Sequence, residues 1–399
     1  MMTPMRYILL VLGIIISLHF ILSFSHEDYG RATSLSSIKS QIAGSKGYPP
    51  YKDGIPEEYY QSNGTIPSPQ GRKANATFVL LARNSDLNGI AMSMKQMEDR
   101  FNKKFQYPYV FLNEEPFSEE FKSRVSELTD APIQFGLIPH DHWYQPDWVD
   151  EEKASAARAD MVRNQVIYGG IAICADTTQG SFTAMSFCKT TSITGGLSTH
   201  YHIYFKGDRI TYFALRRRPD VTFFCDLDYD PFLIMEDQKK VYGFTVSLYE
   251  YPATIPTLWE TVREFIDANP DLVEEGNAMN FISDDGGNNY NRCHFWSNFE
   301  IGDLDFWRDV PYTKFFEFLD SKGGFYYERW GDAPVHSIGA ALFAKKEQIH
   351  FFSDIGYRHN PFQHCPQGDA HKKGKCWCNP NDNFDYEGYS CLNRYDKMF

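Results

Sequence analysis

The chain has 399 residues, a formal net charge of -13 and an aromatic content of 16%. The length suits one large domain or two smaller ones with tails, and the acidic balance argues against nucleic-acid binding, which usually needs a basic face. A nucleotide could still bind if a divalent cation and a few basic groups offset its phosphates. The aromatic content suits either sugar binding or a large core, and composition does not separate the two.

The N-terminal residues predict a membrane anchor. Arg6 precedes an apolar stretch, residues 7–24, that has no Asp, Glu, Lys or Arg and is long enough for a marginal transmembrane helix. A tail of residues 1–6 with one positive charge favours a cytoplasmic N-terminus. A cleaved signal peptide is the alternative, although no clean cleavage site follows. We expect a cytoplasmic tail at 1–6, a transmembrane signal anchor at 7–24, a flexible stem at 25–74 and a luminal domain over 75–399.

Glycosylation sequons and cysteines agree with a location in the secretory lumen. Asn63 and Asn75 each begin an N-x-Thr sequon. The chain has 8 Cys, and an oxidising compartment favours disulfides among them. A zinc site near the C-terminus is the alternative, but the single residue between Cys376 and Cys378 does not fit a CxxC knuckle. We therefore expect disulfides to pin the C-terminal segment.

The first part of the folded domain predicts a β-α-β unit. Residues 77–83 are an apolar run typical of a buried strand, and apolar residues then recur at helical spacing over 90–101. Residues 109–113 and 133–138 read as the next strands. This order implies a parallel sheet of the nucleotide-binding kind. A ligand would lie beyond the carboxyl ends of its strands, close to Arg83.

The middle of the domain predicts further helices, strands and an acidic motif. The helices are expected from Asp150 to about Gln165, over 257–269 and over 311–321, and the strands over 221–225 and 242–248. Asp226 and Asp228 follow the first of these strands directly. Two carboxylates on one strand face can hold Mg²⁺ or Mn²⁺ against a nucleotide diphosphate. A solvated acidic turn before Pro231 is the structural alternative.

Residues 293–359 interleave carboxylates, histidines and aromatic rings most densely. Glu300 lies among aromatic residues that could shield an intermediate, and such a carboxylate can attack or stabilise a sugar cation. Asp332 sits in a Gly-Asp-Ala-Pro turn suited to binding sugar hydroxyls. His336 and His359 could ligate a metal or move protons. A salt-bridged glutamate and buried structural histidines are the alternatives.

Several long motifs carry a family resemblance. They are His142-Trp-x-x-Pro-x-Trp148, Val166-Ile-Tyr-Gly-Gly170, Phe223-Phe-Cys-Asp-Leu-Asp-Tyr-Asp-Pro231, Cys293-His-Phe-Trp-Ser-Asn-Phe-Glu300 and Gly323-Gly-Phe-Tyr-Tyr-Glu-Arg-Trp-Gly-Asp-Ala-Pro-Val-His336. In these motifs the chain resembles the fungal α-1,2-mannosyltransferases of the Ktr/Mnt type, glycosyltransferase family 15. The similarity covers residues of about 77–168 and 219–365.

The resemblance implies both a fold and an activity. The fold would be an α/β, GT-A-like domain with a Rossmann-like mixed sheet, in a single-pass type II protein of the Golgi membrane. The activity would be transfer of mannose from GDP-mannose to a mannose 2-hydroxyl on N- or O-linked glycans of glycoproteins. Such enzymes retain the anomeric configuration and use Mn²⁺.

The resemblance also implies roles for individual residues. Glu300 matches the proposed nucleophile, and Asp332 matches an active-site carboxylate that meets the acceptor. His359, in Asp-Ile-Gly-Tyr-x-His, matches a metal ligand. Arg83 and Tyr168 match positions near the GDP.

Residues 171–218 depart from the family pattern. The family has Ser-x-x-Tyr-Arg-x-x-Cys-Arg, Ser-Gly-Phe-Phe and Tyr-Trp-Arg-Val-Glu-Pro segments after Gly170, and none is present. The glutamate before that proline is the family's other metal ligand, and Arg218 stands in its place. Two explanations stay open: an error in the predicted sequence, such as a retained intron, or a catalytically impaired homologue that binds glycans or GDP. A glycoside hydrolase using Glu300 and Asp332 is a third hypothesis, which the β-α-β start disfavours.

Overall fold

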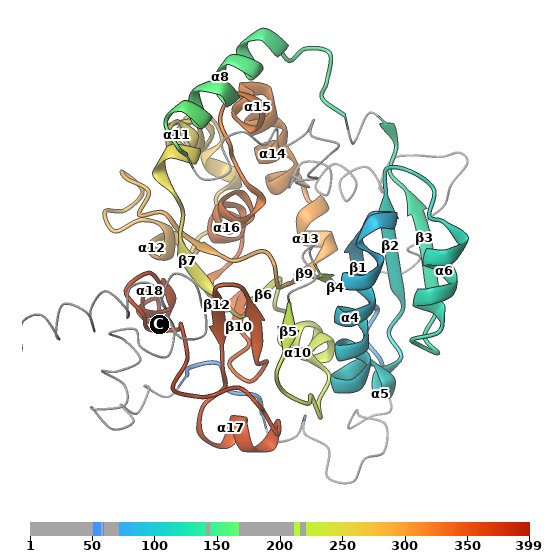
Figure 1. Cartoon of the computed structure of the whole chain (residues 1–399). Helices are drawn as coiled ribbons and strands as arrows, with labels where there is room; N and C mark the ends of the chain where they lie inside the picture. Colours follow the sequence, from blue (N-terminus) through green and yellow to red (C-terminus); the bar gives the residue numbers. More distant parts are fainter. Residues whose placement is uncertain (1–50, 57–58, 60–71, 141–143, 167–210, 216–220) are drawn as a thin grey trace, which may run out of the picture. The chain divides into compact units, whose positions relative to one another are not determined.

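The computed structural model describes residues 51–56, 59, 72–140, 144–166, 211–215 and 221–399, and for 211–215 only the backbone. Tyr51–Cys378 and Asn383–Phe399 form one compact unit, which contains all the elements below (Figure 1). The expected anchor, residues 7–24, lies outside the described residues. No helix in the described part of the chain has both the length and the apolar character needed to cross a membrane.

A seven-stranded mixed sheet forms the centre of this unit, in the order β10-β6-β9-β4-β1-β2-β3. The strands are β1 Ala76–Leu81, β2 Tyr109–Asn113, β3 Ile133–Leu137, β4 Thr211–Leu215, β6 Tyr242–Phe244, β9 Glu300–Asp303 and β10 Ile349–Phe351. β1, β2, β3 and β4 are mutually parallel, whereas β9 runs antiparallel to both β4 and β6. The predicted α/β class with a mixed sheet is therefore confirmed.

β4 is a strand that the sequence analysis did not predict. It lies inside the atypical segment 171–218, yet it occupies the middle of the sheet. Val79 of β1 is paired with Ala214, and Phe213 is paired with Ile301 of β9. Its sequence, Thr-Tyr-Phe-Ala-Leu, is rich in residues that favour strands, and this was the available signal. The atypical segment thus supplies a central strand of the fold.

Helices cover both faces of the sheet. They are α4 Leu87–Met97, α5 Lys103–Phe105, α6 Glu119–Ser126, α8 Glu151–Arg163, α10 Pro231–Asp237, α11 Leu258–Ala268, α12 Met279–Ile282, α13 Leu304–Arg308, α14 Val310–Lys322, α15 Gly324–Tyr327, α16 Asp332–Phe343, α17 Gly368–Lys373 and α18 Leu392–Asp396. The helices expected at 150–165, 257–269 and 311–321 correspond to α8, α11 and α14. Asp150 caps α8 by accepting a hydrogen bond from the backbone N–H of Lys153, 3.1 Å away.

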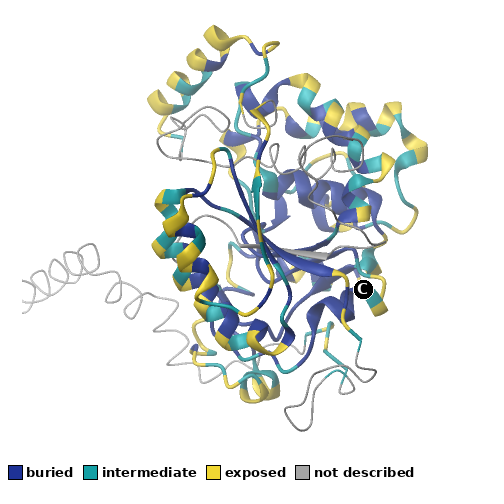
Figure 2. Cartoon of the chain, turned by 90° about the vertical axis from the view of Figure 1, so that its right-hand side faces the viewer, coloured by how far each residue is buried: buried dark blue, intermediate teal, exposed yellow. Residues whose placement is uncertain are grey.

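Successive side chains of a strand point to opposite faces of the sheet, so the buried core forms two clusters, one on each face. Phe78 and Leu80 of β1 pack with α4, α6 and α10, whereas Val79, between them, packs on the opposite face with α11, α14 and α16. In α16 every residue after Asp332 is buried. Figure 2 shows the buried residues concentrated in the strands and the helices packed on them, with exposed residues along the outer helical faces.

Two smaller sheets complete the fold, and two of their strands were predicted from the sequence as parts of longer strands. β5 Thr222–Phe223, β11 Tyr357–His359 and β12 Phe362–His364 form a three-stranded sheet, and β7 Ser247–Tyr249 pairs with β8 Cys293–Phe295. The strand predicted over 221–225 is therefore only β5. The strand predicted over 242–248 is wrong as one strand, because the chain leaves the central sheet after β6 and pairs again as β7. A continuous apolar run does not show where such a change occurs.

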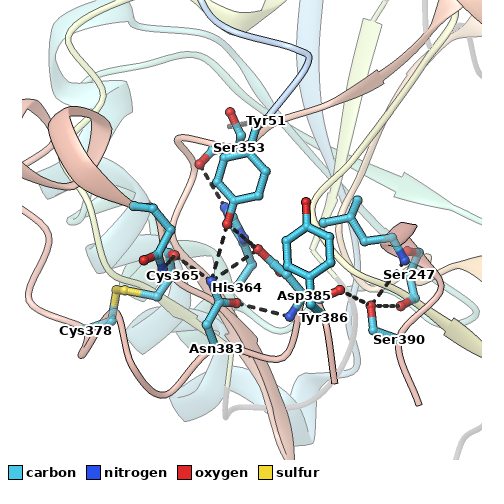
Figure 3. Close-up of polar contacts among 12 residues, drawn as sticks. Tyr51, Ser247, Ser353, His364, Cys365, Cys378, Asn383, Asp385, Tyr386 and Ser390 are labelled. Carbon is cyan, nitrogen blue, oxygen red and sulfur yellow. Dashed lines mark hydrogen bonds and ion pairs between the residues drawn. A yellow bond between two sulfur atoms is a disulfide. The ribbon is translucent and has the colours of Figure 1, made fainter. Parts of the chain in front are cut away.

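Disulfides hold the C-terminal segment, as expected, and a buried polar network also holds it. The described residues form the disulfides Cys225–Cys376, Cys293–Cys391 and Cys365–Cys378. His364 Nδ1 lies 2.9 Å from Asp385 Oδ2, and the Tyr51 hydroxyl donates to the same carboxylate at 2.6 Å (Figure 3). His364 Nε2 lies 3.0 Å from the carbonyl oxygen of Ser353. The network therefore joins the first described residues, β12 and the C-terminal segment.

Candidate active site

Glu300 lies at the edge of the sheet where ligands bind in open α/β folds. It is the first residue of β9, and it is paired with Phe244, the last residue of β6. Because β9 is antiparallel to β6 and β4, its start lies where those strands end. β1 is parallel to β4, so it ends at the same edge, and Arg83 follows it by two residues. The carboxyl ends of parallel strands form the usual binding edge of such sheets.

The Glu300 carboxylate is buried and held by two polar side chains. Glu300 is 2% exposed. The Tyr242 hydroxyl donates to Glu300 Oε2 at 3.0 Å, and His336 Nδ1 lies 3.1 Å from the same oxygen. The indole of Trp307 lies against the imidazole of His336, with ring centroids 4.9 Å apart. A buried carboxylate needs such partners because its isolated charge is costly to bury.

The surroundings of Tyr242 keep its hydroxyl a donor. Burial raises the pKa of Tyr242 well above its usual range, and the negative charges of Glu300 and Asp332 raise it further. The phenol therefore stays protonated across the physiological range and donates to Glu300 rather than competing with it for a proton.

Asp332 lies close to Glu300 in the fold. It is the first residue of α16, and it accepts a hydrogen bond from Ser297 Oγ at 2.9 Å. Ser297 belongs to the same loop that leads into β9. A carboxylate at the first turn of a helix is favoured by the helix dipole. Because Ser297 comes three residues before Glu300, this hydrogen bond places Asp332 beside the loop that leads into Glu300.

His294 is a further buried group beside this site. Burial lowers its pKa, against the opposing charges of Glu250 and Asp332. Its Nδ1 atom lies 4.0 Å from Glu250 Oε2. The imidazole is therefore expected to be neutral at pH 7.

His359 reaches the same loop through aromatic contacts. It ends β11 and is buried, and the edge of its imidazole ring lies against Trp296, with ring centroids 4.8 Å apart. Trp296 and Phe299 both lie between β8 and Glu300, and Phe299 packs on Tyr357 of β11 at 5.4 Å. The loop before Glu300 therefore links the glutamate to His359.

The imidazole of His359 is the candidate cation ligand in the described part of the chain. An imidazole is an accepted ligand for such ions. Among the described residues, the one group of three potential ligands at metal-binding distances is Cys365, His371 and Cys378, and its two cysteines form a disulfide. His359 does not belong to this group. Arg218, at the family's second ligand position, lies outside that part.

Arg83 is held at the binding edge by a neighbouring carboxylate. Its Nε donates to Glu114 Oε1 at 3.1 Å, and both side chains are mostly buried. The guanidinium of an arginine is a common partner of phosphate groups. Its role near a nucleotide stays a prediction. Tyr168, predicted to act beside it, lies outside the described residues.

Asp226 and Asp228 are paired with basic side chains. Asp226 Oδ1 accepts from Arg100 at 2.6 Å, and Asp228 forms an ion pair with Lys104. The backbone N–H of Asp226 donates to Gly374, next to the Cys225–Cys376 disulfide. Neither carboxylate contacts Glu300, Asp332 or His359 within the described residues. These ion pairs fit the alternative of a structural acidic turn better than a metal site. Nucleotide binding by Asp226 and Asp228 stays a prediction.

The sequence analysis did not single out Tyr242, Ser297 or Trp307. Tyr242 begins an apolar strand, and nothing in its neighbourhood distinguishes it from a core tyrosine. Its partner Glu300 is 58 residues away along the chain. Ser297 lies in the motif that ends at Glu300. Its position as a polar residue close to Glu300 could have indicated a role in the site.

Comparison with known proteins gives consistent matches across the chain. The protein family described as glycolipid 2-alpha-mannosyltransferase matches residues 52–398, a wider span than the two stretches in which the sequence resemblance was seen. Glycolipid 2-alpha-mannosyltransferase 1 of Candida albicans is 49% identical over 324 residues, which are 81% of this chain and 71% of that protein. Alpha-1,2 mannosyltransferase KTR1 of Saccharomyces cerevisiae is 46% identical over 338 residues, 84% of this chain and 82% of that protein.

A solved structure is also similar. The crystal structure of core-mannan synthase A (CmsA/Ktr4) from Aspergillus fumigatus, in a Mn/GDP form, superposes with a TM-score of 0.71 at 36% sequence identity. The match covers 86% of this chain and 91% of that one. The similarity therefore extends over most of both chains.

Proposed function

The chain belongs to the glycolipid 2-alpha-mannosyltransferase family, and from this premise we propose that it transfers mannose from GDP-mannose to the 2-hydroxyl of mannose-ended glycans. The acceptors are N- or O-linked glycans of glycoproteins, and the α configuration is retained. The observation that carries the proposal is a buried carboxylate, Glu300, at the carboxyl edge of the sheet with Asp332 beside it. The relatives named above support activity rather than an impaired homologue.

Four of the predicted residues have a role in this reaction. The bond between mannose C1 and the diphosphate oxygen breaks, and its electron pair leaves with GDP. The acceptor oxygen bonds to C1, and the proton of its hydroxyl is released to the solvent. Glu300 carries the negative charge that faces the electron-poor C1. Asp332 meets the acceptor hydroxyls, while Arg83 and Tyr168 lie on the nucleotide side.

Manganese is the cofactor that the relatives support, because core-mannan synthase A was solved with Mn and GDP. The metal offsets the charge of the diphosphate leaving group when it is bound. We assign His359 as its protein ligand. The edge contact with Trp296 fixes the orientation of that imidazole.

We propose a Golgi membrane location with a single-pass type II topology and a luminal catalytic domain. The apolar residues 7–24 after Arg6 and the exposed sequon residue Asn75 support it. The disulfides also fit an oxidising compartment. In intact microsomes, protease should leave the folded domain undigested. Digestion without detergent would contradict the topology.

The direct test of the proposed reaction follows the fate of the mannose. With the full-length chain, GDP-mannose, Mn²⁺ and methyl α-mannoside, GDP release should equal the amount of disaccharide formed. GDP release with free mannose would indicate hydrolysis. GDP binding without any release would support the binding protein considered above.

A further inference from the structure

Two polar side chains approach the same oxygen of Glu300. Tyr242 OH and His336 Nδ1 both approach Oε2, at 3.0 Å and 3.1 Å. Two anchors on one oxygen fix the plane of the carboxylate, and so they fix the direction of Oε1 as well. Misplacement of a reacting group by about 1 Å can cost on the order of 100-fold in rate.

The two anchoring groups are themselves rigidly held. Tyr242 is a fully buried residue of β6, the strand directly paired with the strand of Glu300. His336 lies in the second turn of α16 and is 2% exposed. The Trp307 indole at 4.9 Å restricts rotation of its imidazole. The anchors therefore come from a strand and a helix of the core rather than from loops.

From this geometry we infer that Tyr242 and His336 are positioning residues that orient the Glu300 carboxylate toward the anomeric carbon. The inference rests on the proposed function of Glu300. With Glu300 ionised, Tyr242 donates its O–H, and His336 donates from Nδ1–H to the same oxygen. This assigns the Nδ1–H form to His336 whenever Glu300 is charged. In this assignment both residues act through Glu300.

The atom that makes the contact gives a specific test for His336. An asparagine amide lies near the position of Nδ1, whereas a glutamine amide lies near that of Nε2. We expect His336→Asn to keep kcat within about 5-fold of the parent chain, and His336→Gln and His336→Ala to lower kcat about 10- to 100-fold. A role in packing against Trp307 alone would not rank the variants in this order. Equal losses in His336→Asn and His336→Ala would overturn the inference for His336.

Tyr242→Phe removes only the hydroxyl, and the chain offers a matched control. Tyr109 is also a buried strand tyrosine whose hydroxyl donates to a buried glutamate, Glu98, at 2.7 Å. It packs in the cluster on the opposite face of the sheet. We expect Tyr242→Phe to lower kcat about 10- to 100-fold with KM for GDP-mannose and the affinity for Mn·GDP unchanged. Tyr109→Phe should change only the thermal midpoint of unfolding.

The outcomes separate this inference from the proposed function. If Glu300→Gln is inactive and Tyr242→Phe is fully active, Glu300 acts without these anchors and the inference fails alone. If Glu300→Gln keeps its activity, the role of Glu300 fails first. If Tyr242→Phe and Tyr109→Phe lose the same activity, the effect reflects general stability and the positioning role is overturned.

Discussion

Glu300→Gln is expected to lower kcat by about 1000-fold or more, while Mn·GDP binds with its original affinity. The substitution keeps the size of the side chain but removes the negative charge that faces C1 in the transition state. A 1000-fold loss corresponds to about 4 kcal/mol of lost transition-state stabilisation. The nucleotide binds through other groups, so its affinity should change by no more than about 3-fold. Single-turnover rates and calorimetric titration with GDP measure the two quantities separately.

The chain contains a matched control for this variant. Glu98 is also buried, at 4% exposure, and it accepts hydrogen bonds from Tyr109 and Asn102 in the other core cluster. Glu98→Gln should therefore reproduce any general cost of neutralising a buried glutamate. Transfer by Glu300→Gln within about 10-fold of the parent chain would remove Glu300 from the proposed role. The same loss in both variants would indicate unfolding rather than chemistry.

The second large effect concerns stability. Removing the Cys293–Cys391 disulfide by the double substitution to Ala is expected to lower the free energy of unfolding by about 4.7 kcal/mol. The cysteines are 98 residues apart in sequence, and both are fully buried. The bond ties β8, just before the Glu300 loop, to the residue that precedes α18. Without it the unfolded chain gains freedom, and unfolding in guanidinium chloride should begin at a lower concentration.

A shorter disulfide supplies the comparison. Cys365 and Cys378 are only 13 residues apart, so their removal should cost about 2.9 kcal/mol in the same chain-entropy treatment. The Cys293–Cys391 variant should therefore be the less stable of the two by about 2 kcal/mol. The reverse order would show that native-state packing, not the closed loop, determines the contribution of these bonds.

Apolar runs and helical spacing in the sequence predicted several strands and helices correctly. β1, α4 and β2 were expected because an apolar run, a helical period and a second apolar run follow one another over residues 76–113. β4 was not predicted because its segment lacks the family motifs, and only its composition favours a strand. The run 242–248 was read as one strand because apolar continuity does not reveal where a chain changes sheets.

The candidate site was predictable only in its parts. Glu300 and Asp332 were found from their motifs, but their proximity depends on how α16 packs against the loop before β9. The contact of His336 with Glu300 spans 36 residues, and that of Tyr242 spans 58. Such contacts depend on tertiary packing, so no periodicity could show them. The ion pairs of Asp226 and Asp228 could not be predicted for the same reason, because their partners Arg100 and Lys104 come from a helical segment far away in the sequence.

The central claim is that this chain forms an α-1,2-mannosidic bond with retention, and a proton NMR spectrum of the product tests it most directly. The full-length chain would be incubated with GDP-mannose, Mn²⁺ and methyl α-mannoside, and the disaccharide would be recorded before any further reaction. We predict a new α-anomeric mannose signal with a through-bond correlation to C2 of the acceptor. A β-anomeric signal, a correlation to another acceptor carbon, or free mannose as the product would contradict the account.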